Sequence, residues 1–255
     1  MKHTLSQYRL ADIDPYRPVR HVSAVIPALN ERAHIQGCIA SLLDQPEIIE
    51  VVVSDGGSMD GTRAVALAAG ARVIQAGHRG RGFQIFDGIS NTTGDVVLVV
   101  HADCRLTSGS ASRMLAALNA DRLLAGGALG MAFTSRARRL ELIARLNNLR
   151  ARFSGISFGD QGQFFRKEAL ERIGGFPRQM LMEDVELSLR LGRAGRIALL
   201  PRGVLASPRR WETRSFASRT LQVLHLFTRY MLSRRKGRLE ETAEDYYRRY
   251  YGKKE

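Results

Sequence analysis

The chain has 255 residues, of which 44% are hydrophobic and 25% charged, a composition typical of a globular protein large enough for one α/β domain. No segment approaches the ~18 apolar residues of a membrane-spanning helix, and residues 1–20 lack the apolar core of a signal peptide. The two cysteines form no zinc or disulfide pattern. Together these observations predict a cytoplasmic protein. The net charge of +14, concentrated in the second half, indicates an anionic partner: nucleic acid, a membrane surface or a phosphorylated small molecule.

Strands and helices alternate through the first half of the chain. Apolar, β-branched runs predict strands, the first of which stops near Pro27, and apolar residues at helical spacing between these runs predict helices. The predicted strands are 21–29, 48–53, 72–76 and 95–100, and the predicted helices are 30–45, 62–70 and 80–94. This order within about 80 residues predicts a parallel, doubly wound α/β sheet.

The second half has a looser pattern. A strand is predicted at 125–133, a basic amphipathic helix at 136–153, and a loop leading to a strand and a helix start at 157–170. A further helix begins at Glu183 and ends at Gly192 or Gly195, followed by a last short strand at 196–201. From Ser207 onward the chain is predicted to be helical and basic.

The turn "SDGGSMDGT" at 54–62 follows the second predicted strand. Asp55 leaves that strand, and Gly56 and Gly57 permit a ligand to approach closely. A carboxylate at this position can accept a hydrogen bond from a nucleobase imide, while the simpler interpretation is an ordinary turn with Asp60 capping the next helix. The first crossover lacks the G-x-G-x-x-G fingerprint and no Walker loop occurs, which argues against NAD binding and against an ATPase.

The stretch "VVLVVHADC" runs from the buried fourth strand into His101 and Asp103. Open α/β sheets bind ligands at the carboxyl ends of their strands. A carboxylate beside an imidazole can hold a divalent cation that bridges phosphate oxygens. The alternative is a polar loop that begins where a core strand ends.

Three acids, Glu183, Asp184 and Glu186, open the helix that follows the apolar residues 180–182. The helix dipole favours acids in the first turn and accounts for at least one of them. A carboxylate held there beside apolar neighbours is a candidate general base.

Arginines beside glycines or beside the only tryptophan are candidate phosphate contacts. Arg79 and Arg81 stand in "HRGRG", and Arg210 precedes Trp211 in "SPRRW". A solvated basic loop, and an arginine stacked on the indole, are the alternatives.

The order and spacing of six segments resemble those of the family 2 glycosyltransferases over residues 21–211. The segments are "VIPALNE", "VVSDGGSMDGT", "HADC", "GDQGQFFRK", "GGF" and "MEDVEL". The segments "HRGRGFQ", "NLRARFSGISFGDQG" and "SPRRWE" are more similar to a bacterial branch labelled arsenosugar-biosynthesis glycosyltransferases.

This resemblance implies a GT-A fold, a Rossmann-like and mostly parallel doubly wound sheet, that binds a nucleotide-sugar donor, usually a UDP-sugar, with Mn²⁺ or Mg²⁺. It implies a glycosyltransferase domain at 21–206, with a nucleotide-sugar half at about 21–105 and an acceptor half at about 106–206. Residues 207–255 then form a basic helical appendage.

The resemblance also implies roles for single residues. Pro27, Asn30 and Glu31 would lie along the nucleoside, and Asp55 would meet the base. In the mechanism that we expect, Arg79, Arg81 and Arg210, singled out above from their sequence neighbours, would assist at the diphosphate.

For the metal and the chemistry, Asp103 matches the metal-binding carboxylate of the D-x-D motif, whose first acid is replaced by His101. An imidazole in place of that first carboxylate predicts that the site prefers Mn²⁺ over Mg²⁺. Asp184, with Glu183 beside it, matches the catalytic base of an inverting transfer. Ser207 replaces the glutamine of the Q-x-x-R-W motif, which predicts a non-processive enzyme.

Asp160, Gln161 and Trp211 are candidate contacts to an acceptor of unknown identity, and the basic helix at 136–153 fits an anionic one. One rival function is a nucleotidyltransferase, although no glycine-rich loop follows the first strand. Another is a basic nucleotide-binding or membrane-docking protein without transferase activity, since residues 219–236 form an amphipathic basic helix. A homo-oligomer and a peripheral contact with the inner membrane face stay open, and the absence of a known binding module argues against nucleic acid.

Overall fold

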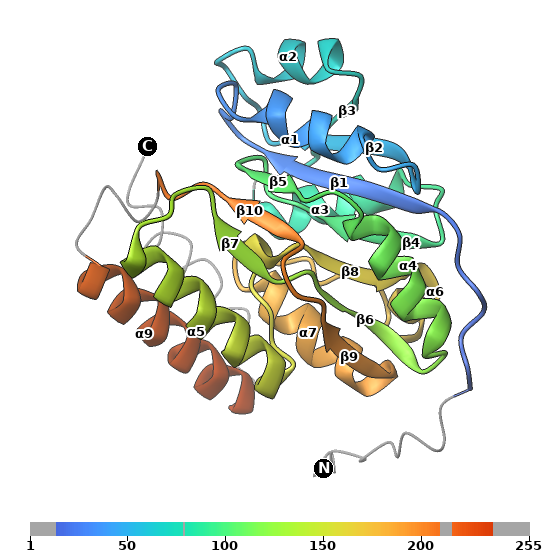
Figure 1. Ribbon diagram of the computed structural model, residues 1–255, viewed down its shortest axis with the longest axis vertical. Helices are drawn as coiled ribbons and strands as arrows, with labels where there is room; N and C mark the ends of the chain where they lie inside the picture. The colour runs from blue at the N-terminus through green and yellow to red at the C-terminus, as the bar shows by residue number, and fades with distance from the viewer. Residues whose placement is uncertain (1–13, 79, 210–215, 237–255) are drawn as a thin grey trace.

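A seven-stranded mixed sheet forms the centre of the protein (Figure 1). The structure is a computed structural model that describes residues 14–78, 80–209 and 216–236. In spatial order the strands are β3 (Arg72–Gln75), β2 (Ile48–Asp55), β1 (Val22–Ala28), β4 (Val96–Val99), β8 (Gln163–Arg166), β6 (Leu124–Ala128) and β9 (Arg196–Leu199). Only β8 is antiparallel to its neighbours β4 and β6. The predicted α/β class with a mostly parallel, doubly wound sheet is therefore confirmed.

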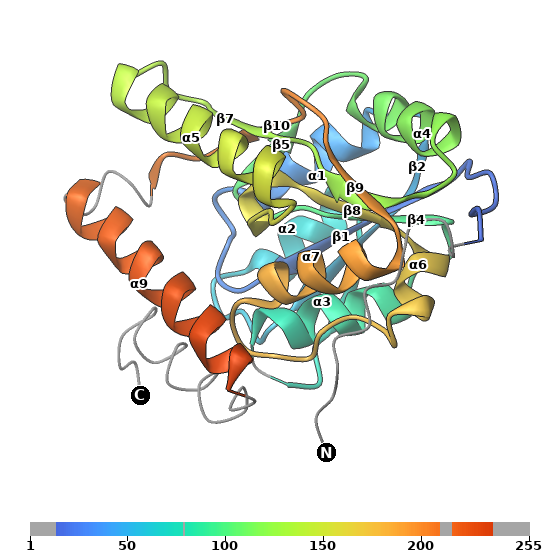
Figure 2. The same ribbon diagram turned by 90° about the horizontal axis from the view of Figure 1, so that it is seen from below.

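Helices cover both faces of this sheet, as Figure 2 shows from below. One face carries α1 (Ile35–Leu43), α2 (Thr62–Ala68), α4 (Ser110–Ala120) and α5 (Arg138–Ser154). The other carries α3 (Arg81–Ser90), α6 (Lys167–Arg172) and α7 (Glu183–Ala194). Both faces are thus buried, which explains why the central strands are continuous apolar runs rather than alternating ones.

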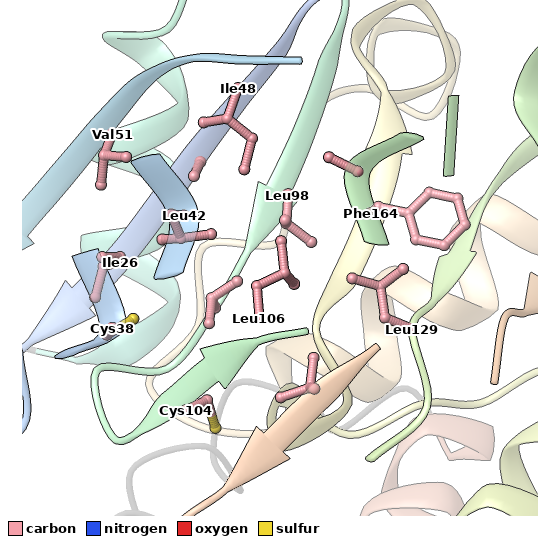
Figure 3. Close-up of a cluster of buried hydrophobic side chains, with 14 of the residues drawn as sticks. Ile26, Cys38, Leu42, Ile48, Val51, Leu98, Cys104, Leu106, Leu129 and Phe164 are labelled. Carbon is pink, nitrogen blue, oxygen red and sulfur yellow. The ribbon is translucent and has the colours of Figure 1, made fainter. Parts of the chain in front are cut away.

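Strand β4 shows how its side chains are shared between two cores. Val96 and Leu98 pack with α1, α4 and α5, whereas Val97 and Val99 point to α3 and α7. Figure 3 shows part of the first core, where Cys38 and Cys104 lie among aliphatic side chains. Both cysteines are buried free thiols, as expected for small core fillers.

The second half differs from its predicted outline in two places. The predicted strand 125–133 is two strands, because Gly130 adopts a positive φ of 61° and turns the chain out of the large sheet. The second piece, β7 (Met131–Phe133), joins β5 (Cys104–Leu106) and β10 (Val204–Ala206) in a three-stranded sheet. Strand β10 follows β9, so the strand predicted at 196–201 is not the last.

The basic helix predicted after Ser207 corresponds to α9 (Phe216–Arg235), which packs on α7. Leu226 and Tyr230 are each 2% exposed, and the Tyr230 hydroxyl donates to Glu186 Oε2 at 2.8 Å. The helix is therefore docked on the element that carries the candidate acids. The domain boundary at 206/207 and the two half-domains stay predictions. No helix among the described residues is long and apolar enough to cross a membrane.

Candidate functional site

His101 and Asp103 lie in the turn between β4 and β5. The apolar run predicts that the strand leads directly into His101 and Asp103. Strand β4 instead ends at Val99, four positions before Asp103. The His101 ring lies against the backbone of Gly159, where an added Cβ atom would collide with the imidazole. Glycine at 159 therefore allows the β4 turn to approach the segment before β8.

Asp55 is fully buried at the end of β2 and organises its own turn. Its Oδ2 accepts the N–H groups of Gly57 at 3.1 Å and Ser58 at 3.0 Å, and its Oδ1 accepts the Ser58 hydroxyl. These bonds hold the loop after β2 in one shape. Contact between Asp55 and a nucleobase stays a prediction.

The loop after β1 is tied to the loop after β2. Asn30 has a positive φ of 55°, donates its N–H to Ser58 Oγ at 2.9 Å and accepts the Met59 N–H at 2.9 Å. Glu31 donates its N–H to Thr62 Oγ1 at 2.8 Å. The predicted nucleoside residues Asn30, Glu31 and Asp55 thus lie on two joined loops. Pro27 is buried inside β1, which ends one residue later at Ala28, near the predicted end of the strand.

Arg209 bridges two carboxylates that follow the adjacent parallel strands β1 and β4 at the same end of the sheet. Its Nε contacts Asp103 Oδ2 at 2.9 Å, and its Nη2 contacts Glu31 Oε1. The backbone N–H of Ser207 also donates to the Asp103 carbonyl at 3.1 Å. Sequence reasoning chose the neighbouring Arg210 and missed Arg209, although the doublet "RR" was the available signal. Arg79, Arg210 and Trp211 lie outside the described residues.

Glu183 and Asp184 open α7 and are both buried, at 1% and 5% exposure. The residue before them, Met182, has a left-handed backbone with φ 62°, which bends the chain into the helix. Arg81 pairs with Glu183 Oε1, and its Nη2 lies 3.4 Å from Asp184 Oδ2. The structure thus places Arg81, predicted to contact a diphosphate, on the two acids.

Asp184 is linked to the β4 turn through Gly159. Its Oδ2 accepts the Gly159 N–H at 2.9 Å, while its Oδ1 accepts the N–H of Val185 at 2.8 Å. Since the His101 ring packs against the same glycine, the predicted metal turn and the predicted base converge there. This convergence joins two segments that are about 80 positions apart in the sequence.

The two described acceptor candidates differ in their surroundings. Gln161 is fully buried, and its Oε1 accepts the Phe158 N–H at 3.0 Å while its Nε2 donates to Asn148 Oδ1 at 3.1 Å. Gln161 therefore holds the loop to α5, and its contact with an acceptor stays a prediction. Asp160 is half-buried beside it and stays a predicted acceptor contact.

Burial raises the pKa of Glu183 to about 7, with the Asp184 charge acting in the same direction and Arg81 opposing it. A folded-state pKa above the unfolded value of about 4.5 favours the protonated folded state. We therefore expect this contribution to stability to be complete below pH ~4.5 and to be lost as the pH rises through ~7, by roughly 3 kcal/mol.

The variant Glu183→Gln is expected to remove this part of the pH dependence. Urea unfolding of both proteins between pH 4.5 and pH 8 measures it, because the free-energy difference between them should change with pH. Glu171→Gln, the same substitution at an exposed position of α6, is the matched control and should follow the wild type. A difference between wild type and Glu183→Gln that is constant over this pH range would contradict the raised pKa.

A divalent cation fits the position that Arg209 occupies between Glu31 and Asp103. Both side chains offer carboxylate oxygens, and both already share one positive group. Mg²⁺ is typically held by one or two carboxylates together with substrate phosphates, so a larger protein cage is not required. Among the described residues no group of three His, Cys, Asp or Glu side chains is placed to hold an ion by itself.

Comparisons with known proteins find similar sequences and similar folds. The model of the family described as glycosyl transferase family 2 matches residues 23–174. Glucosyl-3-phosphoglycerate synthase of Mycobacterium tuberculosis is 31% identical over 106 residues, which are 38% of this chain and 33% of that protein. An uncharacterized glycosyltransferase of Mycobacterium bovis is 30% identical over 98 residues, which are 38% of this chain and 44% of the relative. The matches thus span well under two thirds of these relatives.

Two solved structures are similar in fold. A mannosyltransferase from Pyrobaculum calidifontis in complex with GDP-Man and Mn²⁺ has a TM-score of 0.59 at 21% identity, covering 77% of this chain and 59% of that one. Glucosyl-3-phosphoglycerate synthase from M. tuberculosis, in complex with Mn²⁺, UDP-glucose and phosphoglyceric acid, has a TM-score of 0.55 at 25% identity, covering 71% and 70%. A complex of the same synthase with Mg²⁺ and UDP gives a TM-score of 0.54 at 24% identity, covering 72% of this chain and 70% of that one.

Proposed function

The chain belongs to glycosyl transferase family 2, and we propose that it transfers a sugar, with inversion and without processivity, from a UDP-sugar to an anionic acceptor. The observation that carries this proposal is the convergence on Gly159, where the turn holding His101 and Asp103 meets the carboxylate of Asp184. In a sugar transfer, the groups that bind the donor diphosphate and the base that deprotonates the acceptor hydroxyl need to lie close together.

The donor half of the site consists of the joined loops after β1 and β2. Asp55 lies at the base of this pair of loops, and Asn30 and Glu31 lie along it. A nucleoside held there would have its diphosphate directed to Asp103. The synthase structures, which hold UDP or UDP-glucose, support uridine, whereas the mannosyltransferase structure holds GDP-Man.

Asp103, assisted by Glu31 and His101, would hold Mn²⁺ or Mg²⁺, as the similar structures contain these ions. When bound, the ion would supply positive charge against the departing diphosphate. Arg209 lies on the same carboxylates and is placed to contribute its own charge to the diphosphate once they turn to the ion.

Asp184 would take the proton from the acceptor hydroxyl as that oxygen attacks the anomeric carbon from the face opposite the nucleotide. The N–H of Gly159 holds Oδ2 of this carboxylate in place at 2.9 Å. Glu183 and Arg81 would act beside it, because the guanidinium contacts both acids and keeps two adjacent buried carboxylates close together.

An assay of UDP release from UDP-glucose with Mn²⁺ and 3-phosphoglycerate tests the proposal, because the synthase relatives are named for this acceptor. Release that depends on the acceptor would support the full assignment. If UDP binds but no turnover occurs, other UDP-sugars and other anionic acceptors are tested in place of UDP-glucose and 3-phosphoglycerate. A chain that binds no nucleotide at all would contradict the proposed donor site.

The variant Arg209→Gln is expected to raise the affinity of the nucleotide-free protein for Mn²⁺. The wild-type guanidinium competes with the ion for Asp103 and Glu31, and loss of a charge-assisted contact is worth about tenfold in affinity. Calorimetric titration with Mn²⁺ measures the change. Arg32→Gln, on the exposed loop beside Asp60, is the matched control and should leave the affinity unchanged. An unchanged affinity in Arg209→Gln would remove Asp103 from the metal site.

A further inference from the structure

The outward face of α5 is lined with large apolar side chains. Leu142, Leu146, Leu149 and Phe153 are 55%, 55%, 51% and 80% exposed. Their spacing of four, three and four residues places them in one stripe along the helix. We call these four residues the α5 stripe.

Attachment of α5 to the domain does not require this stripe. The opposite face of the helix buries Leu140, Ile143, Ala144 and Ala151, and packs against β7 and β9. A helix of a globular protein normally has one apolar face, with polar residues on the other. The outer face of α5 is apolar as well, and exposed apolar patches of this kind mark interaction sites.

Arginines flank the α5 stripe along its length. Arg138, Arg139, Arg145 and Arg152 are all exposed on the same helix. The one acid on this face, Glu141, is paired with Arg145 at 2.8 Å. The surface therefore combines apolar side chains with a net positive charge, in a protein whose overall charge is +14.

We propose that the α5 stripe docks on the surface of an anionic lipid bilayer. Leucine and phenylalanine side chains enter the boundary of the acyl region, and arginines beside them contact anionic headgroups, which is the pattern of an interfacial helix. The proposal goes beyond the sugar transfer proposed above and does not depend on it.

Other occupants fit this surface less well. A second copy of the chain, packed by two-fold symmetry through the same stripe, would bring two sets of arginines together. A nucleic-acid backbone would meet the arginines but offers no apolar partner for four large side chains. The bilayer satisfies both the charge and the apolar area.

Docking through α5 would bring the acceptor side of the site close to the membrane. The helix ends at Ser154, and Gly159, which holds Asp184, is only six positions after Phe153. Six residues span at most ~20 Å even when fully extended. Figures 1 and 2 show α5 and α9 at the same side of the molecule.

Vesicle co-sedimentation of the full chain tests the proposal. The wild type is compared on vesicles of phosphatidylcholine alone and of phosphatidylcholine with 30% phosphatidylglycerol, at low and high salt. We expect binding to the anionic vesicles that weakens with salt, and a partition coefficient at least about tenfold lower for the triple variant Leu146→Gln, Leu149→Gln, Phe153→Gln. The matched control replaces three exposed apolar residues outside α5, Leu43, Ile49 and Leu67, by glutamine and should bind as the wild type does.

All six positions are at least 45% exposed, so both triple variants are expected to fold. Thermal unfolding and UDP binding of the two variants check this. The proposal is overturned if the wild type does not bind anionic vesicles at low salt, or if both triple variants lose binding equally. It is also overturned if sedimentation velocity shows a wild-type dimer that only the α5 variant dissociates, because a second copy would then cover the stripe.

Discussion

Asp184→Asn is expected to lower the rate of sugar transfer by about 10²–10⁴-fold, the usual contribution of a general base, while leaving UDP affinity within about twofold of the wild type. The carboxamide oxygen can still accept the Gly159 N–H that Asp184 accepts at 2.9 Å, so the loop before β8 keeps its position. What the variant lacks is the basic oxygen. A loss of turnover with intact nucleotide binding therefore reports on chemistry and not on folding.

Steady-state transfer and calorimetric UDP titration, measured on the same preparation, separate these two effects. Asp160→Asn is the matched control, because this half-buried acid lies one residue after Gly159. We expect a smaller loss that appears in KM for the acceptor rather than in kcat. If Asp160→Asn abolishes turnover and Asp184→Asn does not, the base has been assigned to the wrong carboxylate.

Asp103→Ala is expected to abolish the metal-dependent part of UDP binding. The substitution removes one of the two carboxylates that hold the Arg209 guanidinium and that would hold the metal ion. Loss of one charged ligand should lower UDP affinity in the presence of Mn²⁺ by about 10–100-fold. Affinity without metal should stay near the wild-type value, since the loops after β1 and β2 are untouched.

Calorimetry with and without Mn²⁺, on wild type and Asp103→Ala, measures this difference directly. Asp95→Ala is a useful control, because this acid caps the other end of the sheet, where its Oδ2 accepts the His21 N–H at 3.1 Å. Equal Mn²⁺ dependence in wild type and Asp103→Ala would place the ion elsewhere. Absence of UDP binding under every condition would indicate a different nucleotide.

Much of the sheet could be predicted because its central strands are buried on both faces. Runs such as Ile48–Val53 and Val96–Val99 contain only residues that favour buried strands, apart from Glu50, and glycines or polar turns bound them. The strand at 125–133 was mispredicted because its apolar pattern continues through Gly130, while the backbone turns there. Strand β10 has three residues and too little pattern to be recognised.

The site was partly predictable for a related reason. Asp55 ends β2 and Asp184 lies in the first turn of α7, and local sequence shows such positions. Asp103 was found because it follows the apolar run of β4 by a few residues. Contacts between distant segments carry no local signal. The pairing of Arg81 with Glu183 joins residues that are 102 positions apart, and the choice between Arg209 and Arg210 depends on how the chain leaves β10. The family resemblance is confirmed, while the narrower arsenosugar branch stays a prediction.

The backbone and the burial of Met182 make this position hard to substitute. A non-glycine residue with φ near 60° carries a penalty of roughly 1 kcal/mol, and here it stands directly before the two acids of α7. Glycine would relieve that penalty, but it would also delete a buried side chain and loosen the bend that starts the helix. Deleting a buried methionine side chain costs about 2–5 kcal/mol, more than the backbone penalty that glycine would relieve. Selection for thermostability and selection for turnover should therefore both retain a large side chain at position 182.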